Sequence, residues 1–408
     1  MTINEEALKV RLDHNGLLTT ACKVPLKDRH DLSVLYTPGV AEPCKIIKED
    51  KDLSFEYTCR GNMVAIVSDG TRVLGLGDIG PEAGLPVMEG KAVLFKTFAD
   101  VDALPICLDT KDPDKIVETV RILQPSFAAI NLEDISSPKC YDIEDRLKEI
   151  CDIPIFHDDQ HGTAIALCSA VIGALRFVKK DIKTVRIVVN GCGAAGSAIG
   201  RLLVNMGAEN VIMVDRFGAL YDGIEASLDR VQAYLQKVTN KAKVRGNLAD
   251  VVKGADVLIG VSAPGVFTKE IIASMNTDAI VFGMANPVPE TTYDAAIEAG
   301  AKVAGTGRSD APNQVNNVTV FPGVFRGAMD VRAKAITEEM KIAAVMAIAD
   351  LIEEKDLRAD YVVPDAFDPR VAPAVAAAVA KVAIESGVAR INIDPEVVRA
   401  NTMKRVGR

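Results

Sequence analysis

The stretch VRIVVNGCGAAGSAIGRLL, residues 185–203, decides the fold of the second half of this chain. Its β-branched run leads into three glycines with G-x-G-x-x-G spacing, and an apolar-periodic segment follows them. Such glycines allow a tight turn, a close approach of the backbone to a pyrophosphate, and phosphate binding at a helix N-terminus. The stretch therefore predicts a dinucleotide-binding strand, turn and helix. The expected contacts are Gly191, Gly193, Ala194, Ala195 and Gly196.

An acidic residue stands where the second strand of this unit should end. The run Val211–Val214 is followed by Asp215, roughly 20 residues beyond the glycines, where a carboxylate accepts the ribose hydroxyls of NAD. Such a carboxylate lies against the 2′-phosphate of NADP, so NAD is the expected coenzyme. Arg216 follows directly and could bind that phosphate, which leaves NADP possible.

Strand and helix patterns alternate through this half. A helical pattern over Gly162–Phe177 precedes it, and an Ala-rich helical segment over Ala328–Glu353 and another over Pro373–Ser386 follow it. This order predicts an α/β fold with a parallel, doubly wound sheet and C-terminal helices. The expected strands are 185–190, 211–214, 257–260, 279–282 and 303–304, with helices near 195–206 and 224–238.

The first part of the chain mixes helical patterns with short strands. The turn S-D-G-T predicts a hairpin between Met63–Ser68 and Arg72–Leu76. The other expected elements are helices over 5–12, 113–123 and 141–150 and a strand over 105–108. A domain boundary is expected near residue 160, which gives an N-terminal domain 1–160 and a nucleotide-binding domain 161–408.

Two acidic pairs follow apolar, strand-like runs. Glu133 and Asp134 lie in NLEDI after one run, and Asp158 and Asp159 follow the next in IFHDDQHGTA, residues 155–164. Ligands gather at the carboxyl ends of strands in open α/β sheets, and oxygen ligands suit Mg²⁺ or Mn²⁺ better than zinc. Glu133 and Asp134 can share one ion only if their strand has already ended. The alternative is that the carboxylates cap helices, which fits the second pair better.

Composition narrows the classes of protein. The 408 residues are 49% hydrophobic, with net charge −9, and no basic block stands out, which disfavours nucleic acid or a membrane as partner. The eight cysteines include no C-x-x-C pair, and MTINEEALKV has neither a basic nor an apolar leader region. We expect a cytoplasmic, globular protein with reduced thiols.

Several motifs, in order, resemble those of malic enzymes. They are LYTPGVAEPC (35–44), SDGTRVLGLGDIGPEAGLPVMEGK (68–91), NLEDI (131–135), HDDQHGTA (157–164), VNGCGAAG (189–196) and NQVNNVTVFPGVFRGA (313–328). The chain is similar to the short bacterial form, without a phosphotransacetylase-like extension. The resemblance implies an N-terminal malic-enzyme domain, a Rossmann-type domain and a homodimer. It also implies oxidative decarboxylation of L-malate to pyruvate and CO₂, with reduction of NAD(P)⁺ and a need for Mg²⁺ or Mn²⁺.

The resemblance assigns the proton transfers to Lys91 and Tyr36. Lys91 is the implied general base, and a helix beginning at Ala92 would disfavour its ammonium form through the helix dipole. Tyr36, at an expected helix start with Pro38 in its first turn, is the implied general acid that protonates C3. Without the motifs, Lys91 would be read as a surface charge and Tyr36 as a core aromatic.

The remaining site residues follow from the same resemblance. Metal ligation is implied for Glu133, Asp134 and Asp159, while Asp158 would point toward Lys91 or Tyr36 and tune the proton transfer. The implied substrate-binding residues are Arg72, Asn286 and Asn317, with Asn286 also near the coenzyme. His157 and His161 are expected to support the site without binding the metal.

Three other functions stay open at this level. A malolactic-type lyase would keep NAD and metal but form lactate. An amino-acid dehydrogenase would share the nucleotide fold and a catalytic lysine but need no carboxylate cluster. A non-catalytic sensor would be expected to have lost Tyr36 or Lys91, and both are present.

Overall fold

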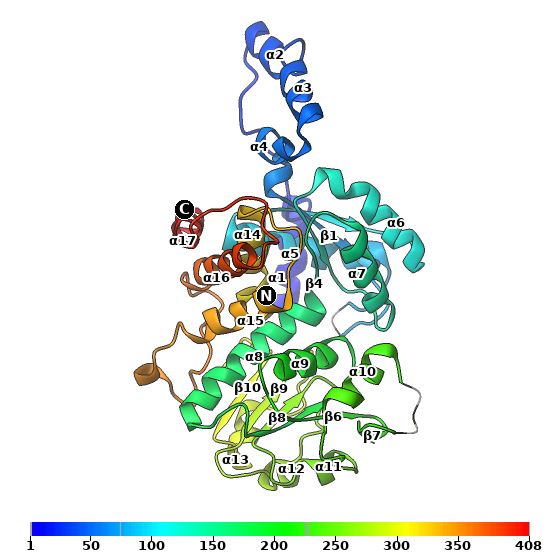
Figure 1. Cartoon of the computed structure of the whole chain (residues 1–408), viewed down its shortest axis with the longest axis vertical. Coiled ribbons are helices and arrows are strands. Elements are labelled where there is room, and N and C mark those ends of the chain that lie inside the picture. Colours follow the sequence, from blue (N-terminus) through cyan, green and yellow to red (C-terminus); the bar gives the residue numbers. More distant parts are fainter. Residues whose placement is uncertain (1, 74, 225, 227, 408) are drawn as a thin grey trace.

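Two sheets organise this computed structural model, which describes residues 2–73, 75–224, 226 and 228–407 (Figure 1). The smaller sheet has the strand order β2-β1-β3-β4, and all of its pairs are parallel. Its strands are β1 (Met63–Ser68), β2 (Asp102–Cys107), β3 (Ala129–Leu132) and β4 (Ile155–His157). The helices of this part are α1 (Ile3–His14), α2 (Arg29–Leu35), α3 (Ala41–Glu49), α4 (Ser54–Tyr57), α5 (Pro81–Ala99), α6 (Pro113–Leu123) and α7 (Lys139–Ile150).

Alternation along β1 explains why helices cover both faces of the smaller sheet. Val64 and Ile66 belong to one buried cluster with Phe95 of α5, while Ala65 and Val67 belong to another that includes α6 and α7. Successive side chains of a strand point to opposite faces, so a strand buried on both sides is apolar throughout. MVAIVS, the sequence of β1, has this character.

The larger sheet has the order β10-β9-β8-β5-β6-β7, and it is parallel except for the β6–β7 pair. This confirms the predicted α/β fold with a parallel sheet. Its strands are β5 (Arg186–Asn190), β6 (Asn210–Asp215), β7 (Gly218–Ala219), β8 (Val257–Gly260), β9 (Ile280–Gly283) and β10 (Val303–Thr306). Its helices are α8 (Asp158–Val178), α9 (Ala194–Asn205), α10 (Arg230–Val238), α11 (Leu248–Val251), α12 (Lys269–Ala273) and α13 (Tyr293–Glu298).

The C-terminal helices pack on both parts of the molecule. One buried cluster runs from Val64 of β1 through α8 and β5 to Val398 near the C-terminus. Phe95 of α5 lies 4.6 Å from Phe321 and 5.1 Å from Phe325, between ring centroids. These helices are α14 (Phe321–Asp330), α15 (Glu338–Ala349), α16 (Val371–Glu385) and α17 (Pro395–Val406). The two sheets therefore share a core across residue 160.

Among the described residues, one helix could span a membrane by length and composition alone. It is α8, and 72% of its apolar window is buried inside the protein. Its apolar side chains serve the shared core, as expected for the central helix of a globular protein.

Three predictions about elements away from the acidic site and Tyr36 are wrong. The S-D-G-T turn makes no hairpin, because β1 pairs in parallel with β2 and β3, and only an isolated bridge joins Val73 and Gly77; Leu74 of the predicted second strand lies outside the described residues. The segment 328–353 is two helices, α14 and α15, with a break between them. The described part of the predicted helix 224–238 is helical only from Arg230, and residues 225 and 227 lie outside the described ones.

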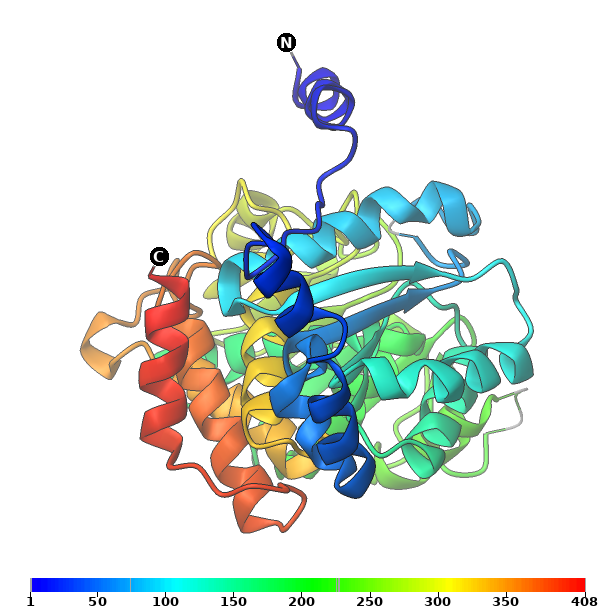
Figure 2. The same cartoon turned by 90° about the horizontal axis from the view of Figure 1, so that it is seen from above.

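The first 50 residues stand apart from the hydrophobic core. No described residue before Val64 is buried. Figure 1 shows α2 and α3 projecting from the body of the molecule, and Figure 2 shows α1, beside the N-terminus, standing off from it. The helix α1 is tied to α5 by polar contacts, which include an ion pair of 3.0 Å between Arg11 and Glu89. This region contributes surface rather than core.

Candidate active site

The two acidic pairs meet because β3 and β4 are neighbours in the sheet. Leu132 and His157 are register partners at the ends of these strands, so Glu133 and Asp134 lie beside Asp158 and Asp159. The strand β3 ends at Leu132, and Asp134 adopts a left-handed backbone with φ of 53°. The condition that the strand ends before the acidic pair is therefore met.

The second pair lies in a helix rather than before one. The helix α8 begins at Asp158, four residues earlier than predicted, and its N-cap residue is His157, whose side chain makes no cap hydrogen bond. Asp158 and Asp159 occupy the first turn, where the helix dipole favours negative charge. The capping alternative for these two residues is thus wrong.

Lys91 sits between the pairs. Its Nζ donates to Oε1 of Glu133 at 3.0 Å and to Oδ2 of Asp158, and it lies 4.1 Å from the ring centroid of Phe321. Its side chain is 9% exposed. The expected approach of Asp158 to Lys91 is present. The helix prediction is wrong here, since α5 begins at Pro81 and leaves Lys91 in its interior, away from a helix terminus.

Charge in this cluster is balanced internally. Burial disfavours the ammonium of Lys91, but Asp158 and Glu133 outweigh burial and hold the pKa of Lys91 above its ordinary value. The expected neutral lysine near pH 7 is therefore contradicted for this arrangement of the site. Burial, aided by the charges of Asp158 and Asp159 and opposed by Lys91, raises the pKa of Glu133 to about 7.

Asp159 links the acidic pairs to Arg72. Its Oδ2 accepts from the backbone N–H of Asp134 at 2.9 Å. Burial and the charge of Asp158 raise the pKa of Asp159 to about 6, while Lys91 and Arg72 act in the opposite direction. Arg72 is exposed, and its backbone N–H donates to the carbonyl oxygen of Asp134 at 3.0 Å. A cationic side chain thus stands at the edge of the carboxylate cluster.

The carboxylates fit a hard divalent cation by their chemistry but are not arranged as a finished site. Crowded, buried carboxylates with raised pKa values gain when a cation offsets their mutual repulsion. Both oxygens of Glu133 are already engaged, one by Lys91 and the other by Asn131 at 2.8 Å. Within the described residues, no three His, Cys, Asp or Glu side chains converge in the manner of a preformed metal site.

Asn317 joins the cluster from the C-terminal part of the chain. It begins the 3₁₀ helix η4 (Asn317–Thr319), and its Nδ2 donates to Oδ2 of Asp158 at 2.9 Å. Thr163 of α8 lies within hydrogen-bonding distance of the same amide, at 3.1 Å. Asn317 therefore touches the acid that binds Lys91.

Asn286 and its neighbour Pro287 lie against the N-terminal part of the molecule. A Cβ placed on Gly75 would lie 2.7 Å from Cδ of Pro287 and 3.3 Å from the carbonyl oxygen of Asn286. The loop that follows Arg72 therefore lies directly against the loop after β9. The two predicted substrate-binding segments come together at this contact.

Tyr36 is a predicted site residue that the fold leaves outside the acidic site. It follows the last residue of α2 and is 67% exposed. The expected helix start at this point is wrong, because Tyr36 ends one helix and the next begins only at Ala41.

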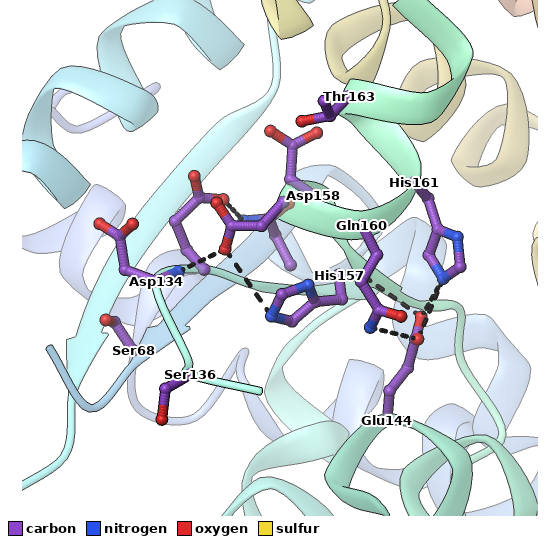
Figure 3. Close-up of polar contacts among 12 residues, drawn as sticks. Ser68, Asp134, Ser136, Glu144, His157, Asp158, Gln160, His161 and Thr163 are labelled. Carbon is purple, nitrogen blue, oxygen red and sulfur yellow. Dashed lines mark hydrogen bonds and ion pairs between the residues drawn. The ribbon is translucent and has the colours of Figure 1, made fainter. Parts of the chain in front are cut away.

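A second polar cluster lies behind the first (Figure 3). Figure 3 shows Asp134 and Asp158 on one side of His157, with Glu144 and His161 on the other. Glu144 accepts from Nε2 of His161 at 2.8 Å, and Nζ of Lys341 lies 3.1 Å from Nδ1 of the same ring. Burial lowers the pKa of His161 to about 3 and that of Lys341 to about 8. This cluster ties α7, α8 and α15 together.

The glycines of the nucleotide motif have the predicted geometry. Gly191 has φ of 114°, and Gly193 is the N-cap of α9, so Ala194 and Ala195 open the helix. A Cβ on Gly196 would collide with the carbonyl oxygen of Gly191, whereas one on Gly193 would meet nothing within 4 Å. Close packing at one glycine and open space at another are what a pyrophosphate site requires.

Asp215 ends β6, as predicted. Its Oδ2 accepts from Nε2 of Gln232 at 2.7 Å, and its Oδ1 accepts from the backbone N–H of Arg216. Arg216 and Arg245 line one pocket beside this strand end. Both a ribose-binding carboxylate and cationic groups are therefore available here.

Sequence reasoning missed several residues of the two sites. Thr163 and Phe321 lie inside motifs that were recognised. Thr163 is close in sequence to the HDD run and Phe321 to Asn317, and this closeness was the signal that could have identified them. Asn131 belongs to NLEDI, but a strand residue before an acidic pair gives no signal of its contact. Arg245 lies in a loop with no motif at all.

A nucleotide-binding sheet joined to a buried lysine–carboxylate cluster defines this protein as a pyridine-nucleotide oxidoreductase. Its second site is lined with carboxylates. The family description "Malic enzyme, N-terminal domain" matches residues 15–113, and "Malic enzyme, NAD binding domain" matches residues 160–384. The chain belongs to the malic enzyme family.

Individual relatives match this chain over nearly its whole length. A bifunctional malic/malolactic enzyme of Bacillus subtilis is 56% identical, over 99% of this chain and 98% of its own. An NAD-dependent malic enzyme of Geobacillus stearothermophilus is 52% identical, over 92% of this chain and 78% of its own. The crystal structure of malic enzyme from Pyrococcus horikoshii superimposes with a TM-score of 0.95 at 44% identity, covering 100% of this chain and 96% of the other.

Proposed function

We infer that the chain catalyses the metal-dependent oxidative decarboxylation of L-malate to pyruvate and CO₂, with reduction of NAD(P)⁺. The observation that carries this conclusion is the Lys91–Glu133–Asp158 cluster at the ends of two parallel strands, in a chain of the malic enzyme family. A malate C2 hydroxyl needs a base within reach, and its carboxylates need cationic and amide donors.

Lys91 is the general base in this proposal. It takes the proton of the C2 hydroxyl as hydride leaves C2 for the nicotinamide. Asp158 and Asn317 are positioning residues, since one accepts from Lys91 and the other donates to Asp158. Release of Glu133 from Lys91 would lower the pKa of Lys91, because one carboxylate rather than two would then oppose the effect of burial.

Glu133, Asp134 and Asp159 are the proposed metal ligands. A divalent cation bound there supplies Lewis acidity toward the oxygens of the substrate. Arg72, Asn286 and Asn317 bind the substrate carboxylates, with Arg72 as the cationic partner. Tyr36 donates the proton that C3 acquires after CO₂ has left.

The coenzyme-binding residues are Gly191, Gly193, Ala194, Ala195, Gly196, Asp215, Arg216 and Asn286. A nicotinamide held by these residues would supply the hydride acceptor. Asp215 favours NAD⁺, because its carboxylate ends β6 at the ribose position, while Arg216 would have to fold back to reach a 2′-phosphate. We also propose that the chain divides near residue 160, works as a homodimer and is cytoplasmic.

The deciding test is a spectrophotometric assay of malate with NAD⁺ and with NADP⁺, each with and without Mg²⁺ or Mn²⁺. Reduced coenzyme should form only with metal, and CO₂ should appear in equal amount. Calorimetric titration with Mn²⁺ in the absence of substrate should show affinity weakened at least about tenfold in Asp159→Asn. Full turnover in excess chelator by enzyme verified as metal-free would refute the metal assignment.

A malolactic reaction is the second candidate, favoured by the bifunctional relative at 56% identity. In it, the reduced coenzyme would return its hydride to pyruvate before release, and lactate would leave. Lactate formed without net accumulation of NADH would establish that activity. Equal amounts of NADH and pyruvate would exclude it.

A further inference from the structure

Glu290 is a buried carboxylate that lies outside the acidic site. It ends the segment ANPVPE, residues 285–290, which follows β9, and its exposed fraction is 0%. The groups that donate hydrogen bonds to its two oxygens are backbone N–H groups and a hydroxyl, all of them neutral. A buried carboxylate is costly unless such bonds replace its lost hydration. The donors are therefore held firmly by Glu290.

These donors come from two different loops. Oε1 of Glu290 accepts from the backbone N–H of Ser262 at 2.6 Å and from the hydroxyl of the same residue at 3.2 Å. Oε2 accepts from the backbone N–H of Ala285 at 2.9 Å. Ser262 follows β8 and Ala285 follows β9, and Gly260 and Gly283 are register partners at the ends of these two strands. One carboxylate thus joins the loops at the carboxyl ends of two neighbouring strands.

The loop after β8 lies against the glycine turn of the nucleotide site. Nδ2 of Asn190 donates to Oγ of Ser262 at 2.7 Å, and the backbone N–H of Val261 donates to the carbonyl oxygen of Asn190 at 2.9 Å. A Cβ on Gly191 would lie 2.6 Å from the carbonyl oxygen of Val261. The turn that we assign to the pyrophosphate therefore packs on a loop that Glu290 fixes.

The loop after β9 carries Asn286, the proposed donor to both substrate and coenzyme. Ala285 directly precedes it, so the hydrogen bond from Ala285 to Glu290 fixes the backbone from which the Asn286 side chain projects. That side chain is exposed, and the next residue, Pro287, lies against Gly75 in the N-terminal part. This second loop thus faces the substrate side of the molecule.

The glycine that ends β8 leaves room for the Glu290 side chain. A Cβ on Gly260 would lie 2.5 Å from Cδ of Glu290 and 2.7 Å from the ring of Phe267. Any larger residue at this position would displace the carboxylate. Packing and hydrogen bonding together hold Glu290 in one orientation, which is what a group that supports a functional site requires.

We propose that Glu290 is a positioning residue shared by the coenzyme site and the substrate site. It holds the Ser262 loop against the glycine turn and, through Ala285, sets the direction of Asn286. The inference rests on the proposed function, which assigns Asn286 to both ligands. Hydride transfer requires the nicotinamide and C2 of malate to be aligned, so a single group that fixes both loops would set their relative placement.

The test is Glu290→Gln, which keeps the shape of the side chain but turns one acceptor oxygen into a donor. That amide group would oppose one of the N–H groups that now donate to Glu290. The KM for malate and the KM for NAD⁺ should both rise by about tenfold, because the ligands must then order the loops on binding. The dissociation constant of NADH, measured by fluorescence without turnover, should rise by about the same factor.

The matched control is Glu298→Gln, an exposed glutamate of α13, which should leave all three constants unchanged. A purely structural role for Glu290 would lower the Tm of Glu290→Gln but leave both KM values unchanged below the unfolding transition. That result, or a change in the KM of only one ligand, would overturn the proposal. If the wild-type enzyme failed to oxidise malate, the proposed function would fail, while NADH binding would still test the link from Glu290 to the glycine turn.

Ser262→Ala separates the two loops. It removes the hydroxyl contacts with Glu290 and Asn190 but keeps the backbone hydrogen bond to Glu290. The dissociation constant of NADH should rise by about threefold, whereas the KM for malate should stay within about twofold. In the double variant Glu290→Gln/Ser262→Ala, the effect on NADH should be smaller than the product of the single effects. Should Glu290→Gln not fold, an unchanged affinity for NADH in Ser262→Ala would by itself refute the proposal.

Discussion

The two ligand sites of this molecule are built in opposite ways. The nucleotide site is open and made mostly of backbone, since a Cβ on Gly193 would meet nothing within 4 Å. The acidic site is closed and charged, with Lys91 only 9% exposed between Glu133 and Asp158. The first depends on space, and the second depends on charge balance in a buried volume. Substitutions should therefore act by steric collision at one site and by loss of a charged partner at the other.

The largest effect is expected for Lys91→Ala. Removal of the proposed base should lower kcat for malate oxidation by about 10²–10⁴-fold. Affinity for NAD⁺ should stay within about twofold, because the nucleotide site is separate. Lys96→Ala is the matched control, on the same helix with a side chain 55% exposed. A near-wild-type kcat in Lys91→Ala would show that the acidic site does not depend on the charge of Lys91.

Next in size is the loss of the charged cluster behind the acidic site. Glu144→Gln should destabilise the protein by about 3–5 kcal/mol, because it removes the buried carboxylate that pairs with Lys148 and that also accepts the hydrogen bond of His161. Asp142→Asn on the same helix, where the side chain is 53% exposed, should cost about 1 kcal/mol or less. Denaturant unfolding at pH 7 measures both. Equal effects would show that burial does not distinguish them.

The pH dependence of that cluster has a definite sign. Despite the cost of burial, His161 and Lys148 hold the pKa of Glu144 well below its ordinary value of 4.5. Glu144 therefore stabilises the fold above the unfolded-state pKa, and this stability is lost as the pH falls. The difference in unfolding free energy between wild type and Glu144→Gln should shrink when the pH drops from 7 to 4. A difference that grows on acidification would contradict this.

A steric test comes third. Gly196→Ala should destabilise the protein by about 1–3 kcal/mol, because its Cβ collides with the carbonyl oxygen of Gly191. Gly193→Ala should leave the Tm unchanged and raise the KM for NAD⁺, since its methyl group would enter only the space reserved for the pyrophosphate. Calorimetry and coenzyme kinetics separate the two outcomes. A lower Tm in Gly193→Ala would show that this glycine also serves packing.

The smallest effect is expected at Asp215. Asp215→Ser should shift the ratio of kcat/KM for NADP⁺ over NAD⁺ upward by about tenfold, as repulsion is removed and Arg216 and Arg245 line the adjoining pocket. Asp222→Ser, at an exposed ion pair with Lys243, should leave the ratio unchanged. A wild-type enzyme that already prefers NADP⁺ strongly would show that Asp215 is not the discriminating residue.

Sequence patterns predicted those parts of the molecule in which one segment contains the whole signal. The glycines, the end of β6 at Asp215, and most strands of the larger sheet fall in this group, because a β-branched run and a turn are local properties. The hairpin after Ser68 failed for the converse reason. Its turn residues are genuine, but β1 is more favourably buried between two parallel neighbours than beside a short segment in which Arg72 and Leu76 are exposed.

The acidic site shows what only the tertiary structure decided. The motifs marked Lys91, Glu133 and Asp158, yet the partners of Lys91 lie 42 and 67 residues away, and Asn317 lies 159 residues from Asp158. The pKa of Lys91 is raised, whereas the prediction had it lowered. The prediction assumed a helix terminus beside Lys91, but the fold places two carboxylates there. Residue identities are written in the sequence, but their charge states depend on which groups the packed sheets bring within a few ångströms.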